Sequence, residues 1–214
     1  QVEGVEKARA PLHMLASIVT FGPIFISPGL IDACAEKAIV ITLLDRVGRF
    51  RARIEGPVSG NVLLRRAQYR LSERPDSVAR GFLTGKIANQ RMVLQRALRD
   101  GGEQPLARTE LTAAVEALGG LLRRVSAGSE PLDILRGFEG EAAKIYFGVF
   151  NHLIRSDDLR LRFHGRSRRP PLDAVNALLS FLYALLTHEC RSGCEAVGLD
   201  PAVGFLHRDR PGRP

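Results

Sequence analysis

The hydrophobic pattern of the chain changes at residues 56–61, and this change limits the fold more than any other feature. Before it, short runs of β-branched and aromatic residues lie between Gly and Pro, as in IVTFGPIFISP at 18–28, which is typical of strands. After it, apolar residues recur every three or four positions over long segments, which is typical of amphipathic helices. The sequence therefore predicts an α+β fold, with a small N-terminal β-rich domain at 1–55, a linker at 56–61 and an all-α domain at 62–214.

Composition places the chain among ordinary globular proteins. It has 214 residues, of which 45% are hydrophobic and 25% charged, so it can bury a sizeable core. Its three Cys favour a reducing compartment over a disulfide framework. We find no apolar run long enough to span a bilayer and no export signal, and we expect a cytoplasmic protein without a membrane partner. The first residue is not Met and the last residues form an open loop, so we expect a piece of a longer protein.

The charge of the chain is strongly basic. Its net charge is +8, and most of its basic residues are Arg, whose planar guanidinium matches phosphate oxygens in pairs. This favours a nucleic-acid partner, although a genome rich in G and C also raises the Arg content. Two basic runs, at 160–169 and at the end of the chain, flank one apolar helix. We expect nucleic-acid contacts from these runs and from two earlier helical segments: Arg66, Lys86, Arg162, Arg166, Arg168, Arg169, Arg208 and Arg210.

One carboxylate interrupts an apolar helix face. The segment LRGFEGEAAKIYF at 135–147 has the spacing of a buried stripe, with Ser129 as its expected N-cap, yet Glu139 lies beside that stripe. Gly137 and Gly140 flank Glu139, and Gly inside a helix is unfavourable by roughly 1 kcal/mol. We interpret the two Gly as room for a close approach to the helix.

A second helix is expected at 172–190, apolar on nearly all sides and therefore central and buried. One polar stripe follows it at steps of three and four. The stripe indicates either hydrogen bonds to a partner helix or a polar cavity. Its members are Asp173, Asn176, Ser180, Tyr183 and Thr187.

Among the five His, His207 differs from the others because it follows an apolar segment at the edge of a basic loop. It can present a ring nitrogen to a cleft. A zinc site built from His188, Cys190 and Cys194 is disfavoured, since structural zinc takes four ligands and the sequence offers no evident fourth.

These segments resemble the motifs of one family. LRGFEGEAAKIYF is similar to its Gly-apolar-Glu-Gly helix motif, and GRSRRPPLDAVNALLSFLYALL is similar to its central helix. VGLDPAVGFLHRDRPGRP is similar to its Gly-apolar-x-His motif, and KIANQRMVLQR to its first helical segment. The motifs occur in the family's order and cover nearly the whole chain. The family is that of the CRISPR-associated integrases (CRISPR-associated protein one).

The resemblance implies a function and a set of site residues. It implies that the helical domain is catalytic and that the N-terminal domain mediates homodimerisation. It implies that Glu139, rather than Glu141, and His207 bind one Mn²⁺ or Mg²⁺, and that Tyr183 and Asn176 belong to the catalytic site. The family's third ligand, an acidic residue, is expected beyond Pro214.

The implied reaction joins the 3′-hydroxyl ends of a prespacer DNA to the CRISPR repeat by transesterification. The implied partners are DNA (prespacer and repeat), a second copy of the chain, and the small second CRISPR adaptation protein, in a prokaryotic cell. Two alternatives stay open. One is a non-catalytic nucleic-acid-binding scaffold of the same fold, with Glu139 merely paired to an Arg. The other is a helical oligomerisation domain with an incidental basic surface.

Overall fold

The computed structural model of the chain describes residues 8–57, 61–100 and 105–207. It packs as two compact units, Gln1–Arg66 with Phe181–Pro201, and Ala67–Ser180 with Ala202–Pro214. Two helices, α2 (Val62–Ser72) and α6 (Ala174–Ala196), contribute residues to both units. The domain boundary predicted at 56–61 assigns all of α6 to the helical part, whereas its C-terminal half belongs to the first unit.

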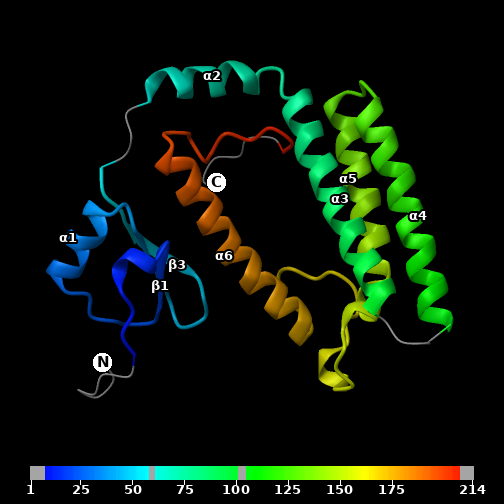
Figure 1. Cartoon of the computed structure of the whole chain (residues 1–214), viewed down its shortest axis with the longest axis horizontal. Helices are drawn as coiled ribbons and strands as arrows, with labels where there is room; N and C mark the ends of the chain where they lie inside the picture. The colour runs from blue at the N-terminus through cyan, green and yellow to red at the C-terminus, as the bar shows by residue number, and fades with distance from the viewer. Residues whose placement is uncertain (1–7, 58–60, 101–104, 208–214) are drawn as a thin grey trace. The chain divides into compact units, whose positions relative to one another are not determined.

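The first unit contains a three-stranded sheet with the order β1 (Ser17–Phe21), β2 (Val40–Leu44) and β3 (Phe50–Ile54). The strands β1 and β2 are parallel and are joined through α1 (Pro28–Glu36), while β2 and β3 are antiparallel (Figure 1). The segments LIDACAEKA at 30–38 and AIVITLLD at 38–45 have the patterns of a short helix and a buried strand, and α1 and β2 form there. Together with the helices of the second unit, this sheet confirms the α+β class.

Both faces of the sheet are covered. On one face, Cys34 of α1 packs with the buried Ile39 and Ile41. The other face carries two aromatic residues that contact the C-terminal half of α6. Phe21 lies 5.7 Å from Phe181, and Phe50 stacks on His188 at 4.9 Å, centroid to centroid. The sequence did not predict this second covering layer.

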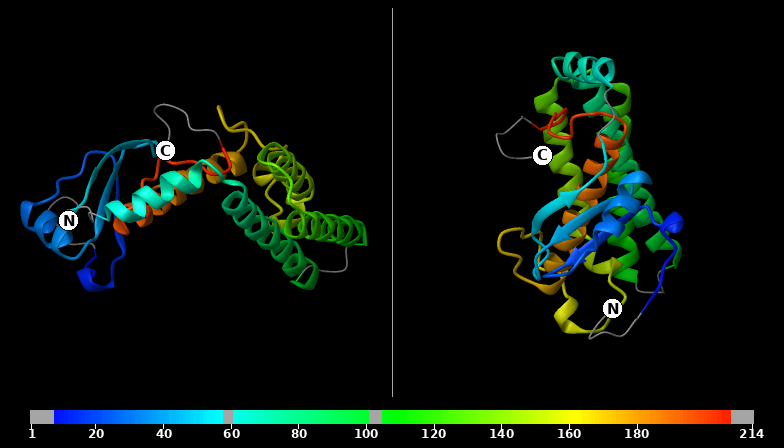
Figure 2. Two further views of the ribbon diagram at one scale, coloured as in Figure 1. Left: turned by 90° about the horizontal axis from the view of Figure 1, so that it is seen from above. Right: turned by 90° about the vertical axis from the view of Figure 1, so that its left-hand side faces the viewer.

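The second unit is built on three long helices, α3 (Asp76–Asp100), α4 (Pro105–Ala127) and α5 (Leu132–Gly148). They run alongside one another, as Figures 1 and 2 show. Arg80 donates hydrogen bonds to the carbonyls of Val125 (2.9 Å) and Glu130 (2.8 Å), which fixes the α4–α5 loop on α3. Each helix contributes apolar residues at three-four spacing to one core: Ala79, Leu83, Ile87, Leu94, Leu111, Ala114, Val115, Leu118, Leu121, Val125, Leu135, Phe138 and Ala142.

The expectation that the apolar helix at 172–190 is buried on all sides is wrong for the described chain. Of α6, only Val175 and Asn176 are buried, while Leu178, Leu182 and Leu186 are exposed. The apolar pattern of the sequence therefore does not correspond to burial in the described chain. In the described parts of the chain, no helix is both long and apolar enough to cross a membrane.

Candidate functional site

Glu139 lies at the edge of the buried stripe of α5, as the sequence predicts. Leu135, Phe138 and Ala142 are buried in the core, and the Glu139 side chain is 23% exposed. The helix begins differently from the prediction. Its N-cap is Pro131 without a side-chain hydrogen bond, so the proposed cap at Ser129 is wrong.

The carboxylate of Glu139 pairs with the ammonium group of Lys86, which extends from the middle of α3. Lys86 is 42% exposed, so the pair is reached by solvent from the α3 side. Burial removes part of the hydration of this carboxylate, and a nearby cation offsets part of that loss. In this structure Lys86 supplies that charge.

The segment that ends at His207 is held close to this ion pair. The Arg136 guanidinium donates a hydrogen bond from Nε to the carbonyl of Leu206 at 2.7 Å and forms an ion pair with Asp133 at 2.6 Å. Arg136 lies one turn before Glu139 on the same helix. Phe205 packs edge-on against Phe82 at 6.4 Å, one turn before Lys86 on α3. The two residues before His207 are thereby held on α5 and α3, each one turn before a member of the Glu139–Lys86 ion pair.

The donors present fit a hard divalent cation. A carboxylate such as that of Glu139 suits Mn²⁺ or Mg²⁺, which keep several water ligands when the protein offers few. Among the described residues there is no group of three or more His, Cys, Asp and Glu that could hold a metal ion. This applies to the disfavoured zinc site at His188, Cys190 and Cys194 as well. His207 itself is exposed.

Asn176 has a different environment from Glu139. It is fully buried, and its Oδ1 accepts hydrogen bonds from Arg166 Nη1 and the Ser167 backbone, both at 2.9 Å. Its Nδ2 donates to the Gly165 carbonyl at 2.8 Å and to Asp173 Oδ2 at 2.7 Å. Every polar position of the amide is therefore used inside the protein. Asn176 fixes the 165–167 loop to the first turn of α6 and positions Arg166.

Asp173 completes this arrangement as the N-cap of α6. Its Oδ1 accepts a hydrogen bond from the Asn176 backbone at 2.7 Å. Burial opposes ionisation, yet the hydrogen bonds from the backbone and side chain of Asn176, with a contribution from His164, lower the pKa of Asp173. Further along the stripe, the hydroxyl of Thr187 donates to the Tyr183 carbonyl at 2.7 Å. Tyr183 is 44% exposed and belongs to the first unit, and its catalytic role stays a prediction.

The predicted nucleic-acid contacts lie on several elements. Arg162, Arg168 and Arg169 are exposed and make no ion pair with a described carboxylate, which leaves their guanidinium groups available for phosphate. Arg66 is exposed on α2. Two further candidates, Arg208 and Arg210, lie outside the described residues.

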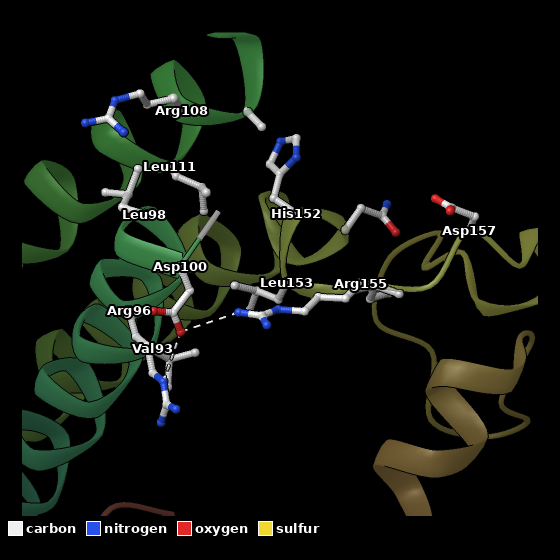
Figure 3. Close-up of a pocket in the computed structure, with 14 residues that line it drawn as sticks. Val93, Arg96, Leu98, Asp100, Arg108, Leu111, His152, Leu153, Arg155 and Asp157 are labelled. Atoms are coloured by element: carbon white, nitrogen blue, oxygen red, sulfur yellow. Dashed lines mark hydrogen bonds and ion pairs between the residues drawn. The ribbon is translucent and has the colours of Figure 1, made fainter. Parts of the chain in front are cut away.

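The second unit also contains a cleft of about 580 Å³ between the C-terminal end of α3, the first turns of α4 and the segment 151–157. In Figure 3, Asp100 lies between Arg96 and Arg155, at 3.3 and 3.4 Å. Nearby, His152 is hydrogen-bonded to Glu110 at 2.6 Å. The charged groups of this cleft largely neutralise one another, and its lining contains neither Glu139 nor His207.

Sequence reasoning missed Gln90 and Arg136, which lie on the helices that carry Lys86 and Glu139. Arg136 gave no local signal, because its partner is a main-chain carbonyl 70 residues away. Gln90 did give one: it falls on the apolar spacing of α3, between the buried Ile87 and Leu94. A polar residue on a core stripe is the same signal that singled out Glu139.

Comparison with known proteins agrees with this architecture. The chain is 62% identical over 216 residues to the CRISPR-associated endonuclease Cas1 2 of Rhodospirillum rubrum, covering all of this chain and 63% of that protein. The chain therefore spans less than two thirds of the length of this relative.

Two solved structures share the fold. One is a casposase bound to integration product (TM-score 0.69, 22% identity, 92% of this chain and 54% of that chain). The other is a Cas6-RT-Cas1–Cas2 complex (TM-score 0.66, 24% identity, 92% of this chain and 21% of that chain). The family model of CRISPR associated protein Cas1 matches residues 1–214. The chain belongs to the CRISPR associated protein Cas1 family.

Proposed function

We propose that the chain is part of a divalent-metal-dependent DNA endonuclease and integrase of CRISPR adaptation. The observation that supports the proposal is the hydrogen bond from Arg136 to the Leu206 carbonyl, which attaches the residue next to His207 to the helix that carries Glu139. The printed name of the Rhodospirillum rubrum relative, an endonuclease, and the casposase captured with integration product support the same reaction class.

Glu139 and His207 are the proposed ligands of Mn²⁺ or Mg²⁺, with a further acidic ligand expected beyond Pro214. A divalent cation held there supplies charge stabilisation to a reacting phosphodiester. Binding by Glu139 competes with its ion pair to Lys86. A cation bound to Glu139 would free the Lys86 ammonium from this ion pair, and the ammonium would then be available to a DNA phosphate.

The proposed reaction is a transesterification. The 3′-hydroxyl oxygen of the prespacer bonds to a repeat phosphorus, and the bond from that phosphorus to the 3′ oxygen of the cut strand breaks. The proton lost by the attacking hydroxyl is balanced by the proton gained by the leaving oxygen. Water in place of the hydroxyl gives hydrolysis. The exposed Arg162, Arg168 and Arg169 bind the backbone phosphates, and Asn176 acts as a positioning residue through Arg166.

The proposed assembly contains two copies of this protein and the small second CRISPR adaptation protein. The support is the likeness in fold to a chain of a Cas6-RT-Cas1–Cas2 complex. Tyr183, exposed on α6, is proposed to act in catalysis.

The test replaces one carboxylate and keeps its neighbour. Glu139→Ala in the full-length protein is expected to lower Mn²⁺-dependent strand joining and nicking by more than about 100-fold, because several kcal/mol of transition-state stabilisation is lost. Glu141→Ala is the matched control, since Glu141 is on the same helix, is 50% exposed and only approaches Arg124 at 3.9 Å. Equal activity of the two variants contradicts the proposed role of Glu139.

A second candidate function is a non-catalytic nucleic-acid scaffold, which the Glu139–Lys86 ion pair favours because it gives the carboxylate a purely structural partner. The two functions differ in the activity of the wild-type protein. A scaffold has no joining or nicking activity that Glu139→Ala could lower, but it still binds duplex DNA with an affinity that falls steeply with salt. Binding that is independent of salt removes both functions and leaves the oligomerisation domain.

A further inference from the structure

Phe82 exposes an aromatic ring on the same side of α3 as Lys86. The residue is 63% exposed and lies four positions before Lys86, so the two side chains follow one another on one face of the helix. Its one ring contact among the described residues is the edge-on packing against Phe205, at 6.4 Å between centroids. Most of the phenyl ring is therefore open to solvent.

Two contacts place this ring beside the ion pair of the candidate site. Phe205 and Leu206 are consecutive residues, and they attach to α3 through Phe82 and to α5 through the Nε of Arg136. Each attachment lies one turn before a member of the ion pair. Four positions along a helix correspond to a rise of about 6 Å. The exposed ring is thus one helical turn from the lysine of the pair.

An exposed ring beside a cation is an arrangement with which proteins bind unpaired nucleotides, because a base stacks on the ring while its phosphate lies at the cation. Lys86 supplies the cation. It is 42% exposed, and in the proposed function it becomes available to a DNA phosphate. A base inside a duplex is already covered on both faces by its neighbours, so an unpaired base is the one that can use the ring.

We propose that Phe82 is a base-stacking residue, which binds an unpaired nucleobase of the DNA strand whose phosphodiester lies at Glu139. The inference rests on the proposed function and adds a base contact to the phosphate contacts of that site. A phenyl ring has no hydrogen-bonding group, so it selects unpaired over paired DNA but does not distinguish one base from another.

The first experiment scans the DNA. The full-length protein is given a duplex with a short unpaired 3′ strand, in which each unpaired nucleotide in turn is replaced by an abasic one. The dissociation constant is measured without divalent metal, so that the DNA is not cut. At one position, loss of the base should raise the dissociation constant about fivefold or more. Equal affinity of wild-type protein for all of these DNA molecules overturns the inference.

The second experiment assigns this step to Phe82. In Phe82→Leu, the same abasic nucleotide should change the dissociation constant by less than about twofold, because the ring on which the base stacks is gone. Phe82→Tyr keeps a ring and should give the wild-type scan. Phe25→Leu is the matched control, with the same exchange at a Phe that is 88% exposed in the first unit. The inference is overturned if Phe82→Leu keeps the step or if Phe25→Leu loses it equally.

A further measurement separates stacking from an effect on the neighbouring segment, since Phe82 also contacts Phe205. The Mn²⁺ affinity of DNA-free Phe82→Leu, measured by calorimetry, should equal that of wild type. A loss of Mn²⁺ affinity as large as the loss of DNA affinity overturns the stacking role. Phe82→Met is the second variant without a ring if Phe82→Leu does not fold. Wild-type protein that neither joins nor nicks the same DNA in MnCl₂ contradicts the proposed function instead.

Discussion

Two regions of the second unit place polar side chains where the sequence pattern calls for apolar ones, and they treat them differently. At the start of α6, Asn176 makes hydrogen bonds at every polar position of its amide. Glu139 of α5, by contrast, pairs with Lys86 of α3, and on α3 the Oε1 of Gln90 has no partner among the described residues. Asn176 is thus a brace, which means that its hydrogen bonds hold the 165–167 loop on the start of α6. A polar residue on an apolar stripe whose hydrogen bonds are not filled within the protein is instead a candidate binding group.

The largest effect expected on stability comes from breaking the brace. Asn176→Leu removes the partner of the Ser167 N–H and of the Gly165 carbonyl and one of the acceptors of Arg166, so the free energy of unfolding should fall by about 2–5 kcal/mol. Urea denaturation measures this loss. Asn151→Leu is a graded comparison, since Asn151 makes two hydrogen bonds to the Phe163 backbone, at 2.7 and 2.9 Å. A smaller loss for Asn176→Leu than for Asn151→Leu contradicts the assignment as a brace.

An intermediate effect is expected from breaking the Glu139–Lys86 ion pair. Lys86→Met should change the free energy of unfolding by less than about 1 kcal/mol, because exposed ion pairs contribute little. Mn²⁺ affinity of the DNA-free protein should increase, since the ammonium no longer competes for Glu139. The dependence of DNA affinity on salt should lose about one phosphate contact. Calorimetry and salt titration measure these changes, and weaker Mn²⁺ binding contradicts the competition.

The smallest effect on stability is expected at His188, which tests whether a buried polar atom without a hydrogen-bond partner is always a binding group. His188, in the first unit, has a buried Nδ1 without a partner among the described residues and stacks on Phe50. Burial, followed by the charges of Arg191 and Arg53, lowers the pKa of His188 from 6.5. Below pH 6.5 the unfolded chain therefore binds a proton that the folded chain does not.

The stabilisation from neutral His188 is therefore complete above pH 6.5 and decreases as the pH falls toward the lowered pKa. His188→Phe should remove this part of the stability loss between pH 7 and pH 5, measured by thermal denaturation in buffers of equal ionic strength. An unchanged pH profile in the variant shows that another group is responsible. MnCl₂ should leave the His188 contribution unaffected, because His188 belongs to the first unit and Glu139 to the second.

The parts of the fold that the sequence predicts are those decided by local periodicity. The α5 stripe through Leu135, Phe138 and Ala142 and the buried strand at β2 are found because burial of one face imposes its repeat on the sequence. The expectation for α6 failed because an all-round apolar helix does not say which of its sides its own chain covers. The brace at Asn176 also depends on tertiary structure, since its partners belong to a loop whose path the sequence does not encode locally.

The hydrogen bond from Arg136 to the Leu206 carbonyl limits how the segment before His207 can vary in sequence. Because the guanidinium binds a main-chain oxygen, this hydrogen bond depends on the path of the chain and not on the side chain at position 206. Insertion or deletion of one residue just before position 206 would present a different oxygen to Arg136. The segment is therefore constrained in length by this hydrogen bond and in residue type by the packing of Leu206 against the core.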